Sequence, residues 1–373
     1  MRDFIELLDT IEDTRQDWKV KHKLSDIIGI TLFSVLGYAD TWEDIEAFAK
    51  HYESFLKQYF ELKNGIPSHD TIRRVIGMLN KDYLNSLIQQ WHELINTDEG
   101  DKLKKILNID GKAICGNGNK NQKAIHVVSA WLKEDGICLG QEAVEEKENE
   151  ITVIPELLDK LNIKGNIVTI DAMGTQKKIA EKIVSKKADY VLALKANHEI
   201  FHNEVIDYFD DFTKEQIRES ENGYLRAVEK AHGQIELREY YQTTDINWFY
   251  DKKDWVKLKS IGMVEKTIKN EKGSKVERRY YISSLPLDIE LFSRSIREHW
   301  SIESMHWHLD VTFKEDANTT LDKNAALNMN ILRKFCLKIL KMVDFGKKIT
   351  AMTRKRFVIC MDAPKYFELL FAF

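Results

Sequence analysis

Apolar residues in the N-terminal part of the chain recur at helical spacing, and they predict an almost wholly helical region up to about residue 95. The segment Leu24–Leu36 carries one such apolar stripe. The next helix is expected to begin after Thr41, with Asp44 at its third position, which makes a capping box with aspartate in place of glutamate. This pattern predicts short helices ahead of any sheet.

The segment 65–74 predicts a turn that leads into a short helix with two exposed arginines, Arg73 and Arg74. This arrangement resembles the second half of a helix-turn-helix, in which both arginines would contact DNA. A plain helical bundle with solvated arginines explains the same pattern. The residues alone leave both interpretations open.

From Leu103 onward the apolar period becomes that of β-strands. Five short β-rich runs are expected, at Lys105–Asp110, Ala124–Leu132, Ile137–Ala143, Asn166–Asp171 and Asp189–Lys195. Helices are expected at Ile151–Leu161, Gln176–Lys186 and Glu199–Phe212. Short turns join the first three strands and predict an antiparallel meander, whereas the helix-separated strands predict parallel crossovers. This β-β-β-α-β-α-β-α order is the pattern of an RNase H-like core.

The helical rhythm stops after about Tyr224. Strands are then expected at Arg238–Thr243, Leu258–Thr267 and Val276–Ser283, and a helical pattern runs from about Ile289 to near Val343. The tail is basic, with Lys347, Lys348, Arg354, Lys355 and Arg356. We interpret it as solvated by default, with DNA contact as the alternative.

The predicted fold class is therefore α/β, with an RNase H-like mixed-sheet core. The expected segments are a helical N-terminal domain at 1–98 that includes the candidate DNA-binding helix, the first part of the core at 99–223, a β-rich insertion at 224–286, and the closing helices of the core with a basic tail at 287–373.

Composition narrows the function classes. A net charge of −4 over 373 residues gives no global support for nucleic-acid binding, so any DNA contact must come from local basic patches. The four cysteines are scattered without a CxxC pair, which argues against a zinc or disulfide framework. No apolar run approaches the roughly 20 residues that cross a bilayer, and the N-terminus lacks an apolar signal core. We expect a cytoplasmic protein without membrane contact.

Two of the predicted strands end in an aspartate followed by a small residue, at Asp110 and Asp171. If these strands are parallel neighbours, both carboxylates lie at the same sheet edge. Their mutual repulsion is relieved most simply by a divalent cation. Two Mg²⁺ ions roughly 3.5–4 Å apart would activate an attacking hydroxyl and stabilise a leaving oxygen. Taken singly, each aspartate is more simply a turn residue, and the pair leaves both interpretations open.

A histidine- and tryptophan-rich segment supplies a third acid. At helical spacing His299, Trp300, Glu303, Trp307 and Asp310 share one face. A carboxylate among aromatic rings is costly unless something pairs with it, and a metal ion would. The alternatives are that the tryptophans anchor the core and the histidines are ordinary hydrogen-bonded side chains. A histidine-based metal site is less suited, because Mg²⁺ prefers oxygen donors.

Six motifs occur in order along the chain: IDGK at Ile109–Lys112, TIDAMGTQ at Thr169–Gln176, ADYVLALKAN at Ala188–Asn197, HGQIELR at His232–Arg238, RYYISSL at Arg279–Leu285 and HWSIESMHWHLDVTFKEDA at His299–Ala317. Together they resemble those of the ISAs-type insertion-sequence transposases, also called H-repeat-associated proteins. The segments SDIIGITLFSVLGYADTWEDIEAFAK and IPSHDTIRRV resemble that family's accessory helical domain, and NAALNMNILRKFCLKILK resembles its closing helix. The resemblance covers nearly the whole chain.

This resemblance implies a DDE transposase whose catalytic and metal-binding acids are Asp110, Asp171 and Glu303. The implied cofactor is Mg²⁺, as two ions, with Mn²⁺ as a substitute. The implied activity is metal-dependent cleavage at the ends of an insertion sequence and strand transfer into target DNA. The expected partners are terminal-repeat and target DNA, in a homodimer or higher synaptic assembly that pairs two ends. An active enzyme would then be associated with the bacterial nucleoid.

The third-acid helix departs from a related pattern. Transposases with a β-insertion have a Tyr, Arg, Glu, Lys signature there, and the Tyr, Arg and Lys positions correspond to Ile296, His299 and Asp310. The group that contacts the terminal phosphate is therefore undefined, and Arg297, Lys314 and His299 are candidates. Asp310 is a rival for the third acid.

Further basic residues near the first acid are candidate DNA contacts. Lys112 in the IDGK motif would reach a phosphate, with a solvated lysine as the alternative. Lys120 and Lys123 lie at the next turn and would contact the backbone. The segment 116–118 reads Gly-Asn-Gly, but no Gly-Lys-Ser/Thr follows, which excludes a P-loop.

Two other functions compete with transposition. A domesticated or inactive copy would bind DNA without cutting it; the intact acids argue against this, and the altered helix face keeps it open. A repair or defence nuclease would use the same core, and flanking inverted repeats in the genome separate it from a mobile element.

Overall fold

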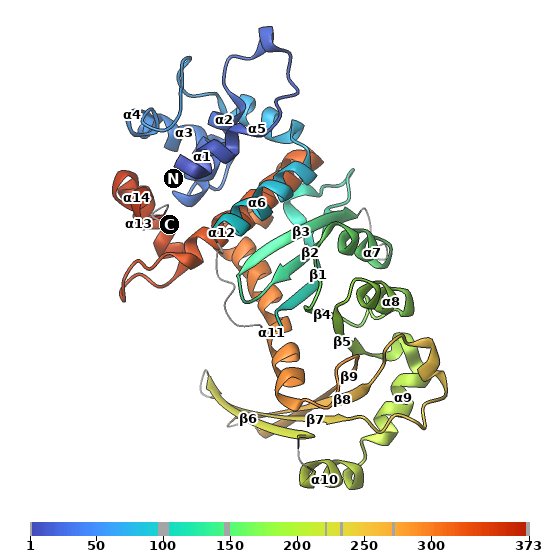
Figure 1. The fold of residues 1–373 in the computed structure, drawn as a ribbon. Coiled ribbons are helices and arrows are strands. Elements are labelled where there is room, and N and C mark those ends of the chain that lie inside the picture. Colours follow the sequence, from blue (N-terminus) through green and yellow to red (C-terminus); the bar gives the residue numbers. More distant parts are fainter. Residues whose placement is uncertain are drawn as a thin grey trace.

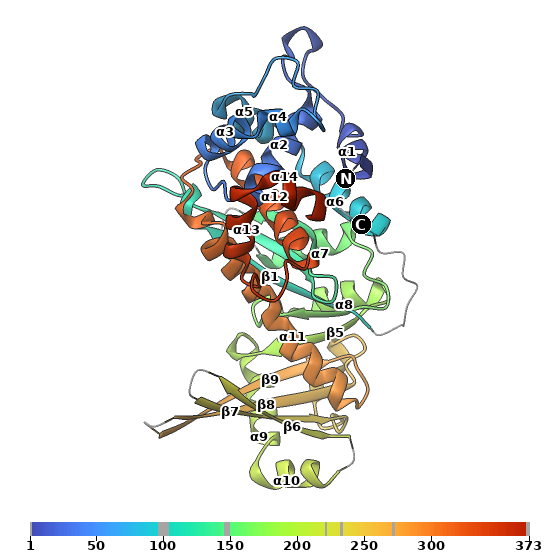
Figure 2. The same ribbon diagram turned by 90° about the vertical axis from the view of Figure 1, so that its left-hand side faces the viewer.

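The computed structural model describes residues 2–95, 104–144, 150–220, 222–231, 234–270 and 273–370. It shows a mixed α/β protein that is elongated in both views, with helices at one end and a sheet that runs through the middle to the other end (Figures 1 and 2). The expected boundary at 98/99 lies outside the described residues, as do His232 and Gly233 of the HGQIELR motif.

The N-terminal region is helical, as predicted. Its helices are α1 (Arg2–Asp9), α2 (Leu24–Leu36), α3 (Trp42–His51), α4 (Glu53–Leu56), α5 (His69–Met78) and α6 (Lys81–Ile95). Every residue of α2 is buried, because this apolar helix is surrounded by α1, α3, α5 and the C-terminal helices. The predicted capping box of α3 is confirmed: the Asp44 backbone N–H donates to Thr41 Oγ1 at 3.1 Å, and the Thr41 N–H donates to Asp44 Oδ2 at 3.0 Å.

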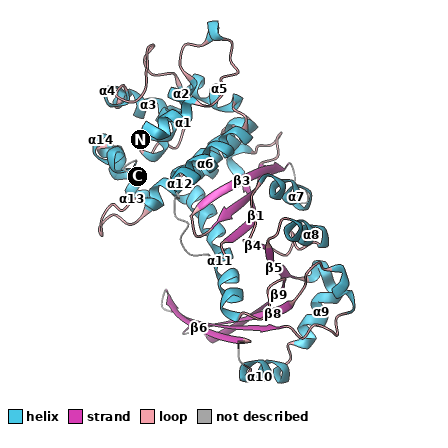
Figure 3. Ribbon diagram, in the orientation of Figure 1, coloured by secondary structure: helices cyan, strands magenta, loops and turns pink. Residues whose placement is uncertain are grey.

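Nine strands of the described residues form one sheet, coloured magenta in Figure 3. The first five are β1 (Ile106–Ile114), β2 (Ile125–Leu132), β3 (Ile137–Val144), β4 (Ile167–Ile170) and β5 (Asp189–Leu194). They lie in the order β3-β2-β1-β4-β5. The antiparallel meander of the first three strands is confirmed, and β4 runs parallel to both β1 and β5, as predicted from the intervening helices.

The β-rich segment after residue 223 continues this sheet. Its strands are β6 (Tyr224–Ala231), β7 (Gln234–Thr243), β8 (Ser260–Asn270) and β9 (Gly273–Ser283). Three of them were predicted, and β6 was not. Because β9 pairs antiparallel with β5, the segment extends the sheet. The single helix predicted at Glu199–Phe212 is two, α9 (Glu199–Tyr208) and α10 (Asp211–Glu219), since Asp210 caps a new start by accepting from the Thr213 N–H at 2.7 Å.

Helices lie on both sides of the first five strands (Figure 1). On one side are α7 (Glu150–Lys160) and α8 (Lys177–Ser185), and on the other are α11 (Ile289–Trp307) and α12 (Lys323–Met342). The prediction of continuous helix from Ile289 to Val343 was wrong. After α11 a π-helical turn covers His308–Thr312, Lys314 is left-handed with φ 49°, and Asp322 caps α12. This interruption lets α12 turn toward the N-terminal helices.

The C-terminal helices α13 (Met352–Met361) and α14 (Ala363–Leu370) lie beside the N-terminal ones in both views (Figures 1 and 2). Two of the basic tail residues are not solvated as expected. Arg356 is fully buried and donates to backbone carbonyls of α2 and of the π-helical turn, and Lys355 donates to the carbonyls that end α12. Lys347, Lys348 and Arg354 are exposed. No helix among the described residues is both long enough and apolar enough to cross a membrane.

Candidate active site

The two aspartates lie side by side in register at one point of the sheet. The parallel pairing of β1 with β4 ends at Ile109 and Ile170. Asp110 directly follows Ile109, and Asp171 directly follows Ile170. The expectation that the first strand ends at Asp110 was wrong, because β1 continues to Ile114 through its pairing with β2. Asp110 therefore lies within a strand, while Asp171 directly follows one.

Helix α11 is fixed on the face of the sheet that carries both aspartates. Asn108 and Thr169 are register partners two residues before the acids, so their side chains share that face. Asn108 Nδ2 donates to the Glu298 carbonyl and to Ser301 Oγ, at 3.1 Å in each case. These buried hydrogen bonds fix the position of α11 beside the acids.

The same network sets the tautomer of His299. Thr169 Oγ1 donates to Asn108 Oδ1 at 2.6 Å, so its contact of 2.8 Å with His299 Nδ1 has the imidazole as donor. Burial lowers the pKa of His299 to about 4, although Asp171 opposes the shift. The ring is therefore neutral at neutral pH, and its Nε2 is left as an acceptor.

The three predicted acids line one pocket of about 720 Å³. Asp110 comes from β1, Asp171 from the end of β4, and Glu303 from α11, one helical turn after His299. Asp171 Oδ1 also accepts from the Gly174 N–H at 3.2 Å. Among the described residues, none of the three acids forms an ion pair with lysine or arginine.

Negative charge accumulates at Asp110. Burial is the main cause that raises the pKa of Asp110 to about 7, and the nearby carboxylates of Asp171, Glu150 and Glu303 raise it further. Burial also raises the pKa of Glu303. His306 Nδ1 lies 3.6 Å from Asp110 Oδ2, but burial lowers the pKa of this imidazole to about 3, so it brings no positive charge.

This raised pKa predicts a pH-dependent effect of Asp110→Asn without divalent metal. The folded protein holds a proton on Asp110 up to about pH 7, whereas the ordinary value is 3.8. Binding of this proton stabilises the folded protein. The stabilisation is complete below the ordinary pKa of 3.8 and is lost as the pH rises through 7. In EDTA, Asp110→Asn is therefore expected to gain thermal stability relative to the unsubstituted protein between pH 5 and pH 8, by roughly a few degrees in melting temperature. A melting-temperature difference that does not change with pH would contradict the shift.

The sequence analysis did not identify two further groups beside Asp110. Glu150, at the start of α7, and His126, on β2, are hydrogen-bonded to each other and buried. A Cβ on Gly111 would collide with Glu150 Oε1 and His126 Nε2, so a larger residue after the first acid would displace this pair. Nothing in the local pattern pointed to this pair, because three separate elements bring it together.

Asp310 and Lys112 lie apart from the pocket of the acids. Lys112 Nζ lies 2.7 Å from Asp310, 3.3 Å from Glu315 and 3.4 Å from Asp316, and its side chain is 11% exposed. The expectation that Lys112 reaches a phosphate conflicts with this surrounding of three carboxylates. Asp310 as a rival third acid fits poorly for the same reason, since its carboxylate is paired with a cation.

The other predicted DNA contacts are dispersed. Arg297 donates to Glu229 at 3.0 Å, and Lys314 Nζ lies 3.0 Å from Asp40, so neither lines the pocket of the acids. Arg73 and Arg74 are exposed on α5 and border a separate hollow with Asp322. Lys120 and Lys123 are exposed in the turn between β1 and β2. Of the predicted basic candidates, the structure brings only His299 to the acids.

The β-rich segment supplies the opposite wall of the pocket. Arg279 on β9 lies there with its guanidinium 4.6 Å from the centroid of the Trp300 ring. Lys195, after β5, and His202, on α9, line the same wall. Arg279 is the first residue of the RYYISSL motif, so the sequence did draw attention to it. The motif alone does not indicate that Arg279 reaches the acids, because that position depends on the pairing of β9 with β5.

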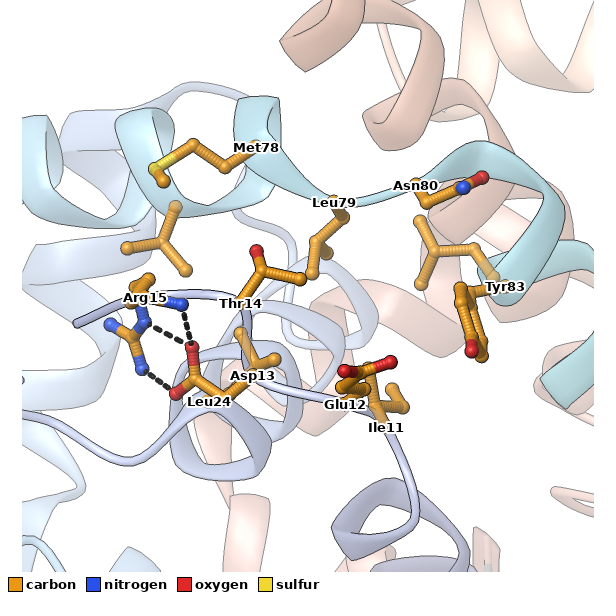
Figure 4. A pocket seen from close by; sticks show the side chains of 12 residues that line it. Ile11, Glu12, Asp13, Thr14, Arg15, Leu24, Met78, Leu79, Asn80 and Tyr83 are labelled. Carbon is orange, nitrogen blue, oxygen red and sulfur yellow. Dashed lines mark hydrogen bonds and ion pairs between the residues drawn. The ribbon is translucent and has the colours of Figure 1, made fainter. Parts of the chain in front are cut away.

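A smaller pocket of about 110 Å³ lies far from these acids, between the segment after α1 and the helices α5 and α6 (Figure 4). It is mostly apolar. Of its charged groups, Arg15 donates to Asp13 at 2.6 and 2.8 Å, and Glu12 lies beside them. The pocket has no carboxylate cluster and offers no comparable chemistry.

Comparison with known proteins identifies the family. Residues 99–339 match the family described as "Transposase DDE domain", and residues 5–92 match the family described as "DDE_Tnp_1-associated". The chain is 38% identical over 352 residues to "Putative transposase YncI" of Escherichia coli O157:H7, covering 91% of this chain and 88% of that protein. It is 36% identical over 348 residues to "H repeat-associated putative transposase YhhI" of Escherichia coli K12, covering 91% and 90%.

A weak structural likeness accompanies these relatives. A piggyBac transposase in a synaptic complex with hairpin DNA, determined by cryo-EM, aligns with a TM-score of 0.42 at 10% identity, covering 98% of this chain and 76% of that one. A score this low supports no inference. The sequence matches suffice, and the resemblance inferred from the motifs is confirmed: the chain belongs to the DDE transposase family, together with the H repeat-associated proteins.

Proposed function

We propose that the chain is an active transposase that cuts DNA at the ends of its own element and joins those ends to target DNA. Asp110, Asp171 and Glu303 are the proposed catalytic acids. One observation carries the proposal: three acids, on β1, directly after β4 and on α11, line a single pocket, and among the described residues no lysine or arginine forms an ion pair with them. Family membership supports the same assignment.

The strand arrangement supports an RNase H-like core for this chemistry. The order β3-β2-β1-β4-β5, with an antiparallel meander followed by two parallel strands, is the arrangement expected of such a core. Within it Asp110 lies on β1, and Asp171 directly follows the neighbouring strand β4. The β-rich segment that precedes α11 enlarges the sheet before the chain supplies the third acid.

The donor set fits Mg²⁺, with Mn²⁺ as a substitute. Carboxylate oxygens without an ion-pair partner are the protein ligands that Mg²⁺ prefers. Burial is the main cause of the raised pKa of Asp110, and a cation would relieve the repulsion by nearby carboxylates that adds to it. Among the residues that the structure describes, no three His, Cys, Asp or Glu side chains converge on one point. Mg²⁺ needs only one or two protein carboxylates because it keeps several waters, so a pair of acids suffices for each ion.

In the proposed reaction Asp110, Asp171 and Glu303 would hold the ions. Bound Mg²⁺ would supply an activated hydroxyl and stabilise charge on the leaving oxygen. Hydrolysis adds water across the P–O3′ bond at the element end and leaves a 3′-hydroxyl and a 5′-phosphate. That 3′-hydroxyl then attacks a target phosphodiester in line, and the target 3′-oxygen leaves with a proton. The network of Asn108, Thr169 and His299 holds α11 in place throughout.

The partners follow from this chemistry. We propose that the chain binds its terminal repeats and target DNA, and that a homodimer or larger synaptic assembly pairs two ends. We also propose the division into segments 1–98, 99–223, 224–286 and 287–373, with the first contacting DNA through Arg73 and Arg74. The exposed position of both arginines on α5 supports this role.

A plasmid that carries the gene with its flanking genomic DNA tests the proposal. In Mn²⁺ or Mg²⁺ the purified protein is expected to produce strand breaks with 3′-hydroxyls at the element boundaries, and then to join those ends to a second plasmid. Asp110→Asn should abolish both products. The breaks are mapped by primer extension, and the joined products by sequencing.

The same assay separates the competing functions. A protein that binds this plasmid but leaves it intact with either metal would be an inactive or domesticated copy. A protein that breaks a plasmid without the flanking DNA equally well, and joins no ends, would be a nuclease of the same fold. Either outcome would remove transposition as the function.

A further inference from the structure

A stacked arginine and tryptophan line the same pocket as the candidate acids. Arg279 extends from β9 and Trp300 from α11, and the guanidinium lies 4.6 Å from the ring centroid. Trp300 is 38% exposed, and both side chains line the pocket that contains Glu303. An aromatic ring holds a cation in position without neutralising its charge, whereas a carboxylate partner would neutralise it. The stack therefore presents a fixed positive group to whatever enters the pocket.

The charge on Arg279 is uncompensated, unlike that of the neighbouring arginines. Arg278 Nε lies 2.7 Å from Glu265, Arg238 lies 2.9 Å from Glu229, and Arg297 is paired with Glu229 as well. Within the described parts of the chain, Arg279 has no carboxylate at ion-pair distance. Its positive charge lowers the pKa of His299 and opposes the rise that burial causes in the pKa of Glu303. It is thus a free positive charge close to the proposed third acid.

The third-acid helix itself offers no such charge. His299 lies one helical turn before Glu303, but its ring is neutral and its Nε2 is an acceptor. A neutral acceptor has no proton to donate to a phosphate oxygen. The next arginine on the helix, Arg297, is paired outside the pocket. A phosphate bound beside Glu303 must be met by a cation from another element.

We propose that Arg279, held on the Trp300 ring, contacts a phosphate of the DNA strand bound at the acids. This inference rests on the proposed function and adds to it the residue that the helix lacks. A guanidinium matches phosphate geometry with two parallel hydrogen bonds, which a lysine does not reproduce. Trp300 is a positioning residue: it holds the guanidinium and does not touch the reacting atoms. Strand β9 of the extended sheet thus supplies the positive charge that α11 does not bring to the pocket.

Two assays test this contact with Arg279→Ala and Arg279→Lys. The first is nicking of the plasmid with flanking genomic DNA in Mn²⁺, where Arg279→Ala should lower the rate about 10²-fold and Arg279→Lys should recover part of it. The second is binding of a fluorescein-labelled duplex of the boundary sequence in EDTA at several salt concentrations. Loss of one phosphate contact should reduce the slope of log K against log[salt] by about 1 for Arg279→Ala, and the lysine variant should keep the slope.

Matched variants make the result specific. Arg226→Ala removes an exposed arginine of β6 that does not line the pocket, and it should leave the nicking rate unchanged. Trp300→Ala should lower the rate about 10-fold, and Trp300→Phe should restore most of it, because a ring again supports the cation. Melting temperatures show whether each variant folds. If Arg279→Ala is unstable, the lysine variant and the salt slope still decide.

Three outcomes would overturn the inference. Equal nicking rates and salt slopes for Arg279→Ala and Arg226→Ala would show that Arg279 contacts no phosphate. A large loss in Lys195→Ala without one in Arg279→Ala would assign the contact to Lys195, another basic residue that lines the pocket. A protein without substitutions that nicks no plasmid would remove the proposed function, which is a different result from an active protein indifferent to Arg279.

Discussion

Glu303→Gln is expected to lower the rate of Mn²⁺-dependent nicking of the plasmid with flanking genomic DNA by at least about 10²-fold. Glutamine keeps the size of the side chain but removes the negative charge. Glu303 is exposed, forms no ion pair among the described residues, and lies in the pocket of Asp110 and Asp171. Its substitution should therefore leave the fold intact. Initial rates at saturating DNA would measure the effect on catalysis, and the melting temperature would show that the fold is retained.

Asp310→Asn is the matched control on the same stretch of chain. Asp310 is paired with Lys112 at 2.7 Å and does not line the pocket, so its variant should keep its rate within about tenfold of the unsubstituted protein. A larger loss in Asp310→Asn than in Glu303→Gln would mean that Asp310 is the third acid. That outcome would require α11 to extend differently past Trp307 when DNA is bound.

Arg356→Ala is expected to lower the free energy of unfolding by about 3–5 kcal/mol. Arg356 is fully buried, lies 2.9 Å from Asp40, and donates to the carbonyls of Val35 and Ala39 at 3.0 and 3.1 Å. It also donates to the Thr312 carbonyl in the π-helical turn after α11. Its removal leaves three carbonyls without this donor and leaves Asp40 with Lys314 as its remaining cation. Urea unfolding, followed by tryptophan fluorescence, measures the loss.

Arg354→Ala controls for the loss of a positive charge from the same helix. Arg354 is exposed on α13, and its substitution should change the free energy of unfolding by less than about 0.5 kcal/mol. If Arg356→Ala were equally mild, the attachment of the C-terminal helices to α2 would depend on apolar packing alone. Stacks such as Phe33 on Phe367, with ring centroids 4.2 Å apart, would then carry that contact.

Sequence patterns predicted the core sheet well because its determinants are local. Alternating apolar runs and short turns specify the meander of β1 to β3, and a helix between strands requires a parallel crossover. That reasoning placed Asp110 beside Asp171, since a strand order with β1 next to β4 brings their carboxyl ends together. The cap at Thr41 was predictable for the same reason, because its partner lies only three residues away.

Features that depend on contacts between distant segments escaped the sequence analysis. Lys112 belongs to a conspicuous motif, but only the fold brings it to Asp310, Glu315 and Asp316. Arg356 belongs to a basic run, and no local pattern indicates that it is enclosed by α2 and the turn after α11. The length of the helix after Ile289 was overestimated because its apolar rhythm continues through residues that the π-helical turn redirects.

The position of the β-rich segment also depends on contacts between distant segments, and this position affects the proposed active site. Its strands were recognisable as strands, but a strand pattern does not specify its partner in the sheet. The pairing of β9 with β5 brings Arg279 to α11, and it joins residues that are far apart in the sequence, from Val191 with Ser283 to Leu194 with Tyr280. A segment that looked like an insertion into the core thereby becomes one wall of the proposed active site.

The central claim is that Asp110, Asp171 and Glu303 together hold divalent metal ions. Crystals grown without metal and soaked in Mn²⁺ test it most directly, through anomalous difference density. We predict density in the pocket between Asp110 on β1, the end of β4 and α11, bonded to oxygens of these three side chains, and its loss in Asp110→Asn crystals. Absence of density there, or density bound by Asp310 in place of Glu303, would contradict the assignment.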